Sequence, residues 1–308
     1  ATTEIYTLSL HDALPISLYL MRTVLTDTPP RDEARIMLCG NPLSLRSEAY
    51  GGNDGRGSGV LVACGQCMAC RINRRRAWTA RVLLESTLHD WSSFVTLTYD
   101  QEHVPWVPAD PDWPGAEVQS LRKKDLQDFC KRLRKELRFR FFGCGEYGDL
   151  TDRPHYHLVM FGVNPLTDAD AVRAAWGMGH VQVAELTKQR AAYTASYTLK
   201  KLGDKVKPKL VHAERQFSSM SRRPGVGVPY VQRMADTIMA KRIPFEEIQG
   251  TVRVEGSVYP LDRTMRMKLK EAVGLPDSWQ FGPPIETGRS CEEIEQARKA
   301  TAKAVRAN

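Results

Sequence analysis

Apolar and polar positions along the middle of the chain follow patterns that predict both strands and helices. β-Branched and aromatic residues gather in short runs, which is typical of buried strands. Elsewhere apolar residues recur every three or four positions, as on one face of a helix. The predicted strands are residues 93–99, 139–148, 155–161 and 180–185, and the predicted helices are residues 71–88, 121–137, 168–176 and 188–202. Strands and helices mixed in this way predict an α+β fold.

The flanking regions are less regular. Residues 46–59 and 104–116 are rich in glycine, proline and small polar residues, so we expect loops there. A hairpin is predicted over residues 251–259 and a polar helix over residues 291–308. No internal repeat is visible, so a repeat architecture is not expected.

The first residues do not fit the rest of the chain. Residues 6–16 look like the conceptual translation of a sequencing-library adapter, and they lack the basic region of a signal peptide. We therefore expect a non-native leader, with Met37 favoured over Met21 as the native start. The predicted segments are the leader (1–36), a cysteine-containing segment with a basic helix (37–92), a core (93–202) and a C-terminal extension with a polar tail (203–308).

Composition points to a polyanionic partner. The 308 residues are 42% hydrophobic, which is enough for a sizeable core, and no apolar run is long enough to span a membrane. Lys and Arg outnumber Asp and Glu by 44 to 36, giving a formal charge of +8. The candidate phosphate contacts are Arg71, Arg74, Arg75, Arg76, Lys123, Lys124, Lys131, Arg132, Arg134 and Lys135. The alternative is that these residues form ordinary solvated helix faces.

Two histidines flank Tyr156 at the start of a predicted strand. Because alternate strand residues face the same side, His155 and His157 should project together and make half of a divalent-metal site. Glu146, at the end of the expected partner strand, can supply an oxygen ligand. Two imidazoles and a carboxylate suit Mg²⁺ or Mn²⁺ holding a phosphate. The alternative is that the histidines cap the strand and Glu146 lies at the surface.

A pair of tyrosines follows on the predicted helix 188–202. Tyr193 and Tyr197 are four residues apart and share one helical face, with Lys200 on an adjoining face. A phenol with a pKa near 10 needs activation before it can act as a nucleophile. The alternative is that both tyrosines only pack a half-buried helix.

The seven cysteines are odd in number and clustered, which favours thiols or metal ligands over a disulfide scaffold. Cys64, Cys67 and Cys70 follow a C-x2-C-x2-C spacing, and Cys39 can complete a tetrahedral zinc site. The same run also suits iron–sulfur ligation. Unligated reduced thiols are the third alternative, and the sequence leaves all three open.

The order of these motifs resembles that of HUH endonucleases. The strand 94–99, the His-Tyr-His unit and the Tyr-x3-Tyr-x2-Lys motif are similar to those of two-tyrosine rolling-circle initiators. The chain looks most like the replication initiators of microviruses, small circular single-stranded DNA phages, of the gokushovirus type. The resemblance includes residues 64–70, 144–148 and 217–225, and it spans residues 37–270.

The resemblance implies a central antiparallel sheet flanked by helices. It also implies a metal on His155 and His157 with Glu146 as the third ligand, and nucleophiles at Tyr193 and Tyr197. One tyrosine would attack a phosphate at a single-stranded DNA origin, become joined to the 5′ end and leave a 3′-hydroxyl primer. The other would cut after one round of synthesis and allow the product to be rejoined. Residue 196 is serine where relatives often have lysine, so the resemblance gives that position no basic role.

No phosphate-binding loop of the G-x4-G-K-[S/T] type occurs, so we expect no nucleotide cofactor. Unwinding and synthesis would then need a host helicase and DNA polymerase, in the cytoplasm of a bacterial host cell. Two alternatives stay open. One is a plasmid initiator, relaxase or transposase with the same chemistry, and the other is a non-catalytic nucleic-acid-binding protein with a cysteine–metal module.

Overall fold

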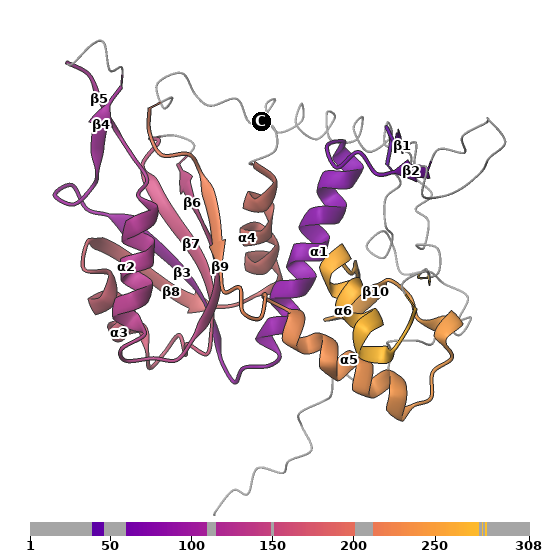
Figure 1. Cartoon of the computed structure of the whole chain (residues 1–308). Coiled ribbons are helices and arrows are strands. Elements are labelled where there is room, and N and C mark those ends of the chain that lie inside the picture. Colours follow the sequence, from indigo (N-terminus) through magenta and orange to yellow (C-terminus); the bar gives the residue numbers. More distant parts are fainter. Residues whose placement is uncertain are drawn as a thin grey trace, which may run out of the picture.

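The computed structural model of the chain describes residues 39–45, 60–109, 115–148, 151–200 and 212–276, together with residues 279 and 281. Helices and an antiparallel sheet make up this part, so the predicted α+β class is confirmed (Figure 1). The expected leader, the loop at 46–59 and the polar tail helix all lie outside the described residues.

A five-stranded antiparallel sheet forms the centre of the fold, with the strand order β8-β3-β7-β6-β9. Its strands are β3 (Ser92–Tyr99), β6 (Arg140–Tyr147), β7 (Pro154–Phe161), β8 (Gly179–Glu185) and β9 (Phe217–Met220). Four of them match predicted strands, and the expected antiparallel hairpin is the β6–β7 pair. β7, which carries both histidines, is the middle strand.

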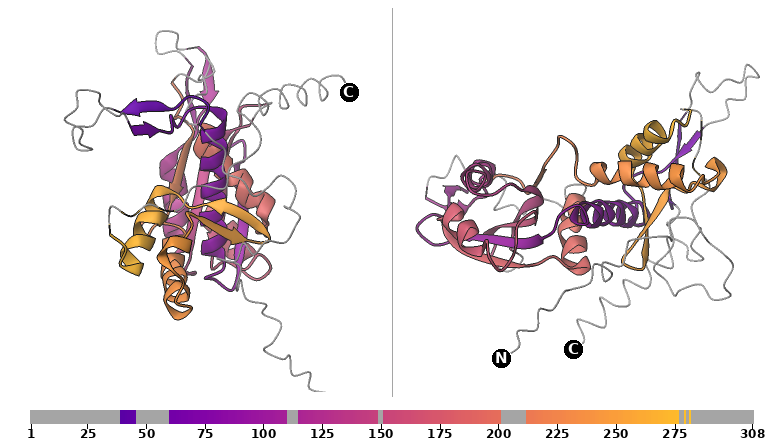
Figure 2. Two further views of the ribbon diagram at one scale, coloured as in Figure 1. Left: turned by 90° about the vertical axis from the view of Figure 1, so that its right-hand side faces the viewer. Right: turned by 90° about the horizontal axis from the view of Figure 1, so that it is seen from below.

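Helices cover both faces of this sheet (Figure 2). The helices are α1 (Met68–Ser86), α2 (Lys123–Leu133), α3 (Ala169–Trp176), α4 (Lys188–Lys200), α5 (Val228–Ala240) and α6 (Arg263–Val273). α2 and α3 pack on one face, whereas α4 and α1 pack on the other. α5 and α6 lie beyond α1 and share its core. The implied arrangement, a sheet flanked by helices, is therefore confirmed.

Three two-stranded hairpins complete the described part of the chain. They are β1 (Leu43–Leu45) with β2 (Val60–Val62), β4 (Trp106–Pro108) with β5 (Glu117–Gln119), and β10 (Thr251–Val254) with β11 (Ser257–Pro260). A short 3-10 helix, Phe245–Glu247, precedes β10. The hairpin predicted near the C-terminus is confirmed, and the predicted loop at 104–116 is corrected because it contains β4.

The predicted helix at 121–137 is also corrected, because α2 ends at Leu133. The apolar spacing continues to Leu137 through a turn whose amide still bonds to the Leu133 carbonyl. Periodicity alone therefore extended the helix by one turn. α5, α6 and the short edge strand β9 were not predicted.

Alternation along β3 separates the two faces of the sheet. Val95, Leu97 and Tyr99 are fully buried toward α2 and α3. Thr96 and Thr98 face the other way, toward α4, with partial exposure. Because side chains alternate at every residue, a one-residue slip of this strand would exchange the core and the α4-facing surface.

Buried tyrosines tie the sheet to the start of α2. The Tyr156 hydroxyl lies 2.7 Å from that of Tyr99, donates to the Arg122 carbonyl at 3.0 Å and accepts from the Arg122 amide at 2.9 Å. The Tyr99 hydroxyl donates to the Asp125 carboxylate at 2.7 Å. Tyr156 thus points away from the histidines on either side of it, as predicted, and fixes β7 from behind.

A fully buried carboxylate joins α1 to the sheet and to the loop before α5. Glu85 receives the Arg140 guanidinium at 2.5 Å and the Gly227 amide at 2.6 Å. Gly227 has a φ of +77°, and a Cβ there would lie 2.9 Å from backbone atoms of Arg81. Glycine is therefore required for this close approach. Arg81 itself pairs with Asp262 at 2.7 Å, which links α1 to the start of α6.

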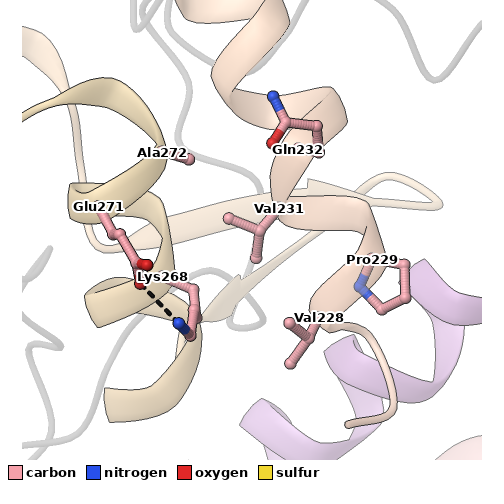
Figure 3. Close-up of a pocket in the computed structure, with 7 residues that line it drawn as sticks. All are labelled: Val228, Pro229, Val231, Gln232, Lys268, Glu271 and Ala272. Carbon is pink, nitrogen blue, oxygen red and sulfur yellow. Dashed lines mark hydrogen bonds and ion pairs between the residues drawn. The ribbon is translucent and has the colours of Figure 1, made fainter. Parts of the chain in front are cut away.

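α5 and α6 leave a shallow hollow between them (Figure 3). It is lined by Val228, Pro229, Val231, Gln232, Lys268, Glu271 and Ala272. Lys268 and Glu271 pair with each other at 2.6 Å on one side of it. Among the described residues, no helix is long and apolar enough to cross a membrane.

Glu85→Gln should destabilise the fold by about 3 kcal/mol, because it removes one partner of a buried ion pair and leaves Arg140 uncompensated. Burial opposes the charged form, but hydrogen bonds from His89, Arg140 and the Gly227 amide lower the pKa of Glu85. A lowered folded-state pKa contributes stability at neutral pH that is lost as pH falls through it. The difference between wild type and variant should therefore shrink in acid, as measured by urea unfolding at two pH values.

The matched control is Glu271→Gln, which removes an exposed carboxylate paired with Lys268. It should change the unfolding free energy by less than about 0.5 kcal/mol. Equal effects of the two substitutions at neutral pH would contradict a structural role for the buried network.

Candidate metal and nucleophile pocket

An open pocket of about 290 Å³ lies between the sheet and α4. Its lining consists of Thr96, Thr98, Glu146, Tyr147, Gly148, His155, His157, Tyr193 and Tyr197. These residues come from β3, β6, β7, α4 and the turn after β6. The structure thus brings all three predicted metal ligands and both predicted nucleophiles to one place.

Strand register explains how the sheet assembles its half of the pocket. His155 is paired with Glu146 of β6 on one side and Thr98 of β3 on the other. His157 is likewise paired with Thr96 on β3. Directly opposite residues of antiparallel strands place their side chains on the same face. Two imidazoles, a carboxylate and two hydroxyls are therefore gathered by the pairing alone.

Each histidine is oriented by a threonine that the sequence analysis did not assign. Thr96 Oγ1 lies 3.1 Å from His157 Nδ1, and Thr98 Oγ1 lies 3.0 Å from His155 Nδ1. A partner at Nδ1 fixes the ring orientation and leaves Nε2 for the pocket. The alternating threonines at the start of the resemblance were the available signal.

The carboxylate of Glu146 contacts both halves of the pocket. His157 Nε2 lies 2.8 Å from Glu146 Oε1, and the Tyr193 hydroxyl donates to the same oxygen at 3.2 Å. Glu146 is only 5% exposed, so it is not the surface carboxylate of the alternative interpretation. A buried carboxylate between an imidazole and a phenol is a strong acceptor at the centre of the pocket.

The donor set fits a divalent cation. Burial, with the neighbouring His157, lowers the pKa of His155, so its ring is neutral and able to ligate at neutral pH. Gly148 keeps the approach open, because a Cβ there would lie 3.2 Å from His155 Nε2. Among the described residues, only a cysteine cluster brings three or more donor atoms within 4.8 Å of one another. His155 must therefore move closer to Glu146 and His157 to share one ion.

The two tyrosines differ in exposure. Tyr193 is 43% exposed and Tyr197 is 8% exposed, and their rings pack edge to face with centroids 4.9 Å apart. Burial, with the Glu146 charge, raises the pKa of Tyr193. Burial and hydrogen bonds to Tyr193 and Glu146 raise the pKa of Tyr197. Both phenols are thus protonated at neutral pH, and either would need activation to attack a phosphate.

Aromatic packing holds His157 beside the tyrosines. Its ring stacks on Phe94 with centroids 5.7 Å apart and on Tyr197 at 6.0 Å, and it meets Tyr193 edge-on at 5.3 Å. Lys200 is the last residue of α4, and its side chain lies outside the described residues. Its expected role therefore stays a prediction.

The predicted basic contacts divide between two places. Arg74 and Arg75 are exposed on α1, whereas the Arg76 guanidinium donates to the Val258 carbonyl at 2.6 Å. The lysines and arginines of α2 lie on the helix that covers the opposite face of the sheet from the pocket. Arg132 there donates to the Ala175 carbonyl at 2.7 Å. Contact of both helices with one DNA strand stays a prediction.

Other α2 residues have local partners as well. Lys124 and Lys131 pair with Asp128 at 2.5 and 3.2 Å. The Arg134 guanidinium lies over the Phe139 ring, 5.0 Å from its centroid. Such pairs are typical of a solvated amphipathic helix, which was the alternative interpretation of this segment.

The four cysteines predicted as a zinc site come together at the start of α1. The sulfur atoms of Cys39, Cys64, Cys67 and Cys70 all lie within 4.8 Å of one another. Burial opposes the charged form of Cys67, but hydrogen bonds from the backbone amides of Cys70 and Gly40 lower the pKa of its thiol to about 6. This cluster is separate from the pocket on the sheet.

Comparison with known proteins places the pocket inside a recognised region. Residues 92–202 match the family model for replication-associated proteins of the ORF2 type. All the pocket residues lie within this match. The chain resembles phage replication-associated proteins. The resemblance that the motifs indicated is thereby confirmed.

The similar curated proteins come from three phages. The replication-associated protein VP4 of Bdellovibrio phage phiMH2K is 30% identical over 45% of this chain and 48% of its own length. Replication-associated protein ORF2 of Spiroplasma virus 4 is 32% identical over 47% of this chain and 49% of its own length. Replication-associated protein ORF4 of Chlamydia phage 1 is 26% identical over 46% and 38%. The match thus spans about half of the first two relatives, and no solved structure matches the chain.

Thr96→Val and Thr98→Val should each weaken Mn²⁺ binding by about 10- to 100-fold, because loss of an orienting partner releases a ligating imidazole. Valine keeps the shape of threonine, so the strand should stay intact. Electron paramagnetic resonance of free Mn²⁺ measures the affinity. Thr167→Val, which removes an exposed hydroxyl near Asp168, is the control. Unchanged Mn²⁺ affinity in both strand variants would rule out this orienting role.

Proposed function

We propose that this protein is a phage replication initiator that nicks and rejoins single-stranded DNA through a tyrosine nucleophile. The observation that carries the proposal is the convergence of two histidines, a carboxylate and two tyrosines in one pocket. The similarity to phage replication-associated proteins supports a role in replication. The nicking chemistry is inferred from the pocket and from the resemblance to HUH endonucleases.

His155, His157 and Glu146 are the residues that would hold Mg²⁺ or Mn²⁺. An ion bound there would polarise the scissile phosphate and offset the charge that develops on its oxygens. The threonines hold the imidazoles in place. Preorganised ligands of this kind cost little reorganisation when the phosphate arrives.

Tyr193 is the better placed nucleophile for the first cut. Its hydroxyl is partly exposed and hydrogen-bonded to Glu146. In the step, the Tyr193 oxygen bonds to phosphorus and the bond from phosphorus to the 3′-oxygen breaks. The phenolic proton leaves through Glu146, its hydrogen-bond acceptor, and the 3′-oxygen takes a proton from water. The products are a 5′-phosphotyrosine and a free 3′-hydroxyl.

Tyr197 makes the second cut. Its ring contacts both His157 and Tyr193, so it lies in the same pocket one helical turn away. The two positions differ by about 6 Å along the helix axis, so one phosphate position cannot serve both without movement. Each phosphotyrosine keeps the energy of the broken bond, so rejoining needs no nucleotide cofactor. A host helicase and DNA polymerase would supply unwinding and synthesis inside the infected bacterial cell.

A plasmid initiator, relaxase or transposase would use the same chemistry. A neighbouring capsid gene on a small circular genome would distinguish the phage initiator from these. A non-catalytic DNA-binding protein would differ in the first test below.

Tyr193→Phe and Tyr197→Phe should each keep a partial strand-transfer reaction, whereas the double variant should form no covalent DNA adduct. Phenylalanine preserves the ring packing while it deletes the nucleophile. A labelled single-stranded oligonucleotide, Mn²⁺ and denaturing gels detect the adduct, and mass spectrometry maps the modified peptide. Tyr230→Phe, a tyrosine of α5 outside the pocket, is the control and should react like wild type.

Two results would overturn the mechanism. One is an adduct on a residue other than Tyr193 or Tyr197. The other is an adduct that persists in the double variant. Absence of any adduct in the wild-type protein, with DNA binding intact, would favour the non-catalytic alternative.

Binding of the double tyrosine variant to single-stranded DNA should weaken with salt, with a log–log slope of roughly −0.7 for each phosphate neutralised. Arg74 and Arg75 are exposed at the start of α1. Changing both to Gln should make the slope shallower by about 1.4 if each contacts one phosphate. Fluorescence anisotropy at several salt concentrations measures the slope. Lys268→Gln on α6 is the control, and a slope unaltered by the arginine changes would exclude α1 from the DNA-binding surface.

A further inference from the structure

A second cluster of reactive side chains lies at the start of α1, where β1 and β2 meet the helix (Figure 1). The four cysteines there are all half-buried or buried and are free thiols. From their geometry we propose that Cys39, Cys64, Cys67 and Cys70 bind one structural Zn²⁺ ion. This proposal does not rest on the nicking function.

The sulfur spacing matches a tetrahedral metal site. Cys39 Sγ lies 3.5 Å from Cys64 Sγ and 3.8 Å from Cys67 Sγ. Sulfurs bonded at about 2.3 Å to a tetrahedral zinc are about 3.8 Å apart along each edge. A disulfide would instead join two sulfurs at about 2.05 Å and leave the other two unpaired. An iron–sulfur cluster would hold each cysteine on a separate iron and spread the sulfurs more widely.

The backbone is arranged to present these sulfurs. β1 and β2 pair so that Leu43 faces Val62, which brings the chain on either side of Cys39 and Cys64 together. Gly65 has a φ of +73°, so the turn between Cys64 and Cys67 needs glycine. The amide of Cys67 then donates to Cys64 Sγ at 3.3 Å, and the amide of Cys64 donates to Cys39 Sγ at 3.3 Å.

The charge balance at the helix start supports a bound anionic complex. Four thiolates and Zn²⁺ together carry a charge of −2, and the N-terminus of a helix favours negative charge. The first turn of α1 contains no acidic residue, whereas Arg71 and Arg74 lie in its first two turns. Without a negative group, these arginines would oppose the helix dipole.

The ion would fasten the β1–β2 hairpin to the beginning of α1. α1 contacts α4 along the side opposite the sheet, and the start of α1 lies at the same end of the molecule as the end of α4 (Figure 1). The zinc site would therefore set where the exposed Arg74 and Arg75 lie relative to the tyrosine helix.

The test uses the full-length protein, purified without chelator and dialysed against zinc-free buffer. Mass spectrometry of the metal content and native mass spectrometry should find one zinc per chain. Cys39→Ser and Cys67→Ser should lose it. Cys130→Ala, which removes a buried thiol of α2, should retain it. Co²⁺ substituted for zinc should give the intense visible bands of a tetrahedral thiolate site.

Two further measurements separate metal loss from misfolding. Circular dichroism should show that the serine variants keep their helices, since the second half of α1 packs in the core independently of the cysteines. In the wild-type protein, N-ethylmaleimide should label the four cysteines slowly until a chelator is added. Absence of zinc from the wild type, stoichiometric iron in its place, or labelling rates that a chelator leaves unchanged would each overturn the proposal.

Discussion

The pairing of β7 between β3 and β6 is the constraint on which the pocket depends. It places His155 and His157 on one face, with threonines on one side and Glu146 on the other. No loop is involved in holding these groups, so their positions are as well determined as the sheet itself. Tyr156, between the two histidines, faces the opposite layer and anchors α2. One strand therefore serves the core and the pocket at once, and neither role can shift without the other.

The phenols come from a different layer. α4 lies across the sheet and carries Tyr193 and Tyr197 toward Glu146 and His157. α1 supports α4 from behind and is itself held by the buried Glu85 and by Arg81. The C-terminal helices share this core, although the curated relatives match the chain over only about half of their length. The domain boundaries expected from the sequence are not tested by this packing and stay predictions.

The sequence predicted the α+β class, four strands of the central sheet and the grouping of the pocket residues. It did so because alternation and the four-residue spacing are local properties that tertiary contacts did not override. It missed α5 and α6, whose apolar faces lie among irregular polar stretches, and β9, whose Phe-Ser-Ser-Met run is too short to show a pattern. Thr96 and Thr98 went unassigned because their role depends on strand register, which a single strand cannot reveal. The fate of Arg76 and Arg132 was hidden for the same reason, since their carbonyl partners are distant in sequence.

The single oxygen shared at the centre of the pocket has one more consequence. Glu146 Oε1 accepts from Tyr193 and touches His157 Nε2. A cation taken up between the imidazole and this carboxylate would draw the oxygen away from the phenol. The phenol would then be released only when the ion is in place. The arrangement thus works as an interlock, in which an ion-free pocket keeps its tyrosine fastened and a loaded pocket frees it to turn toward the DNA backbone.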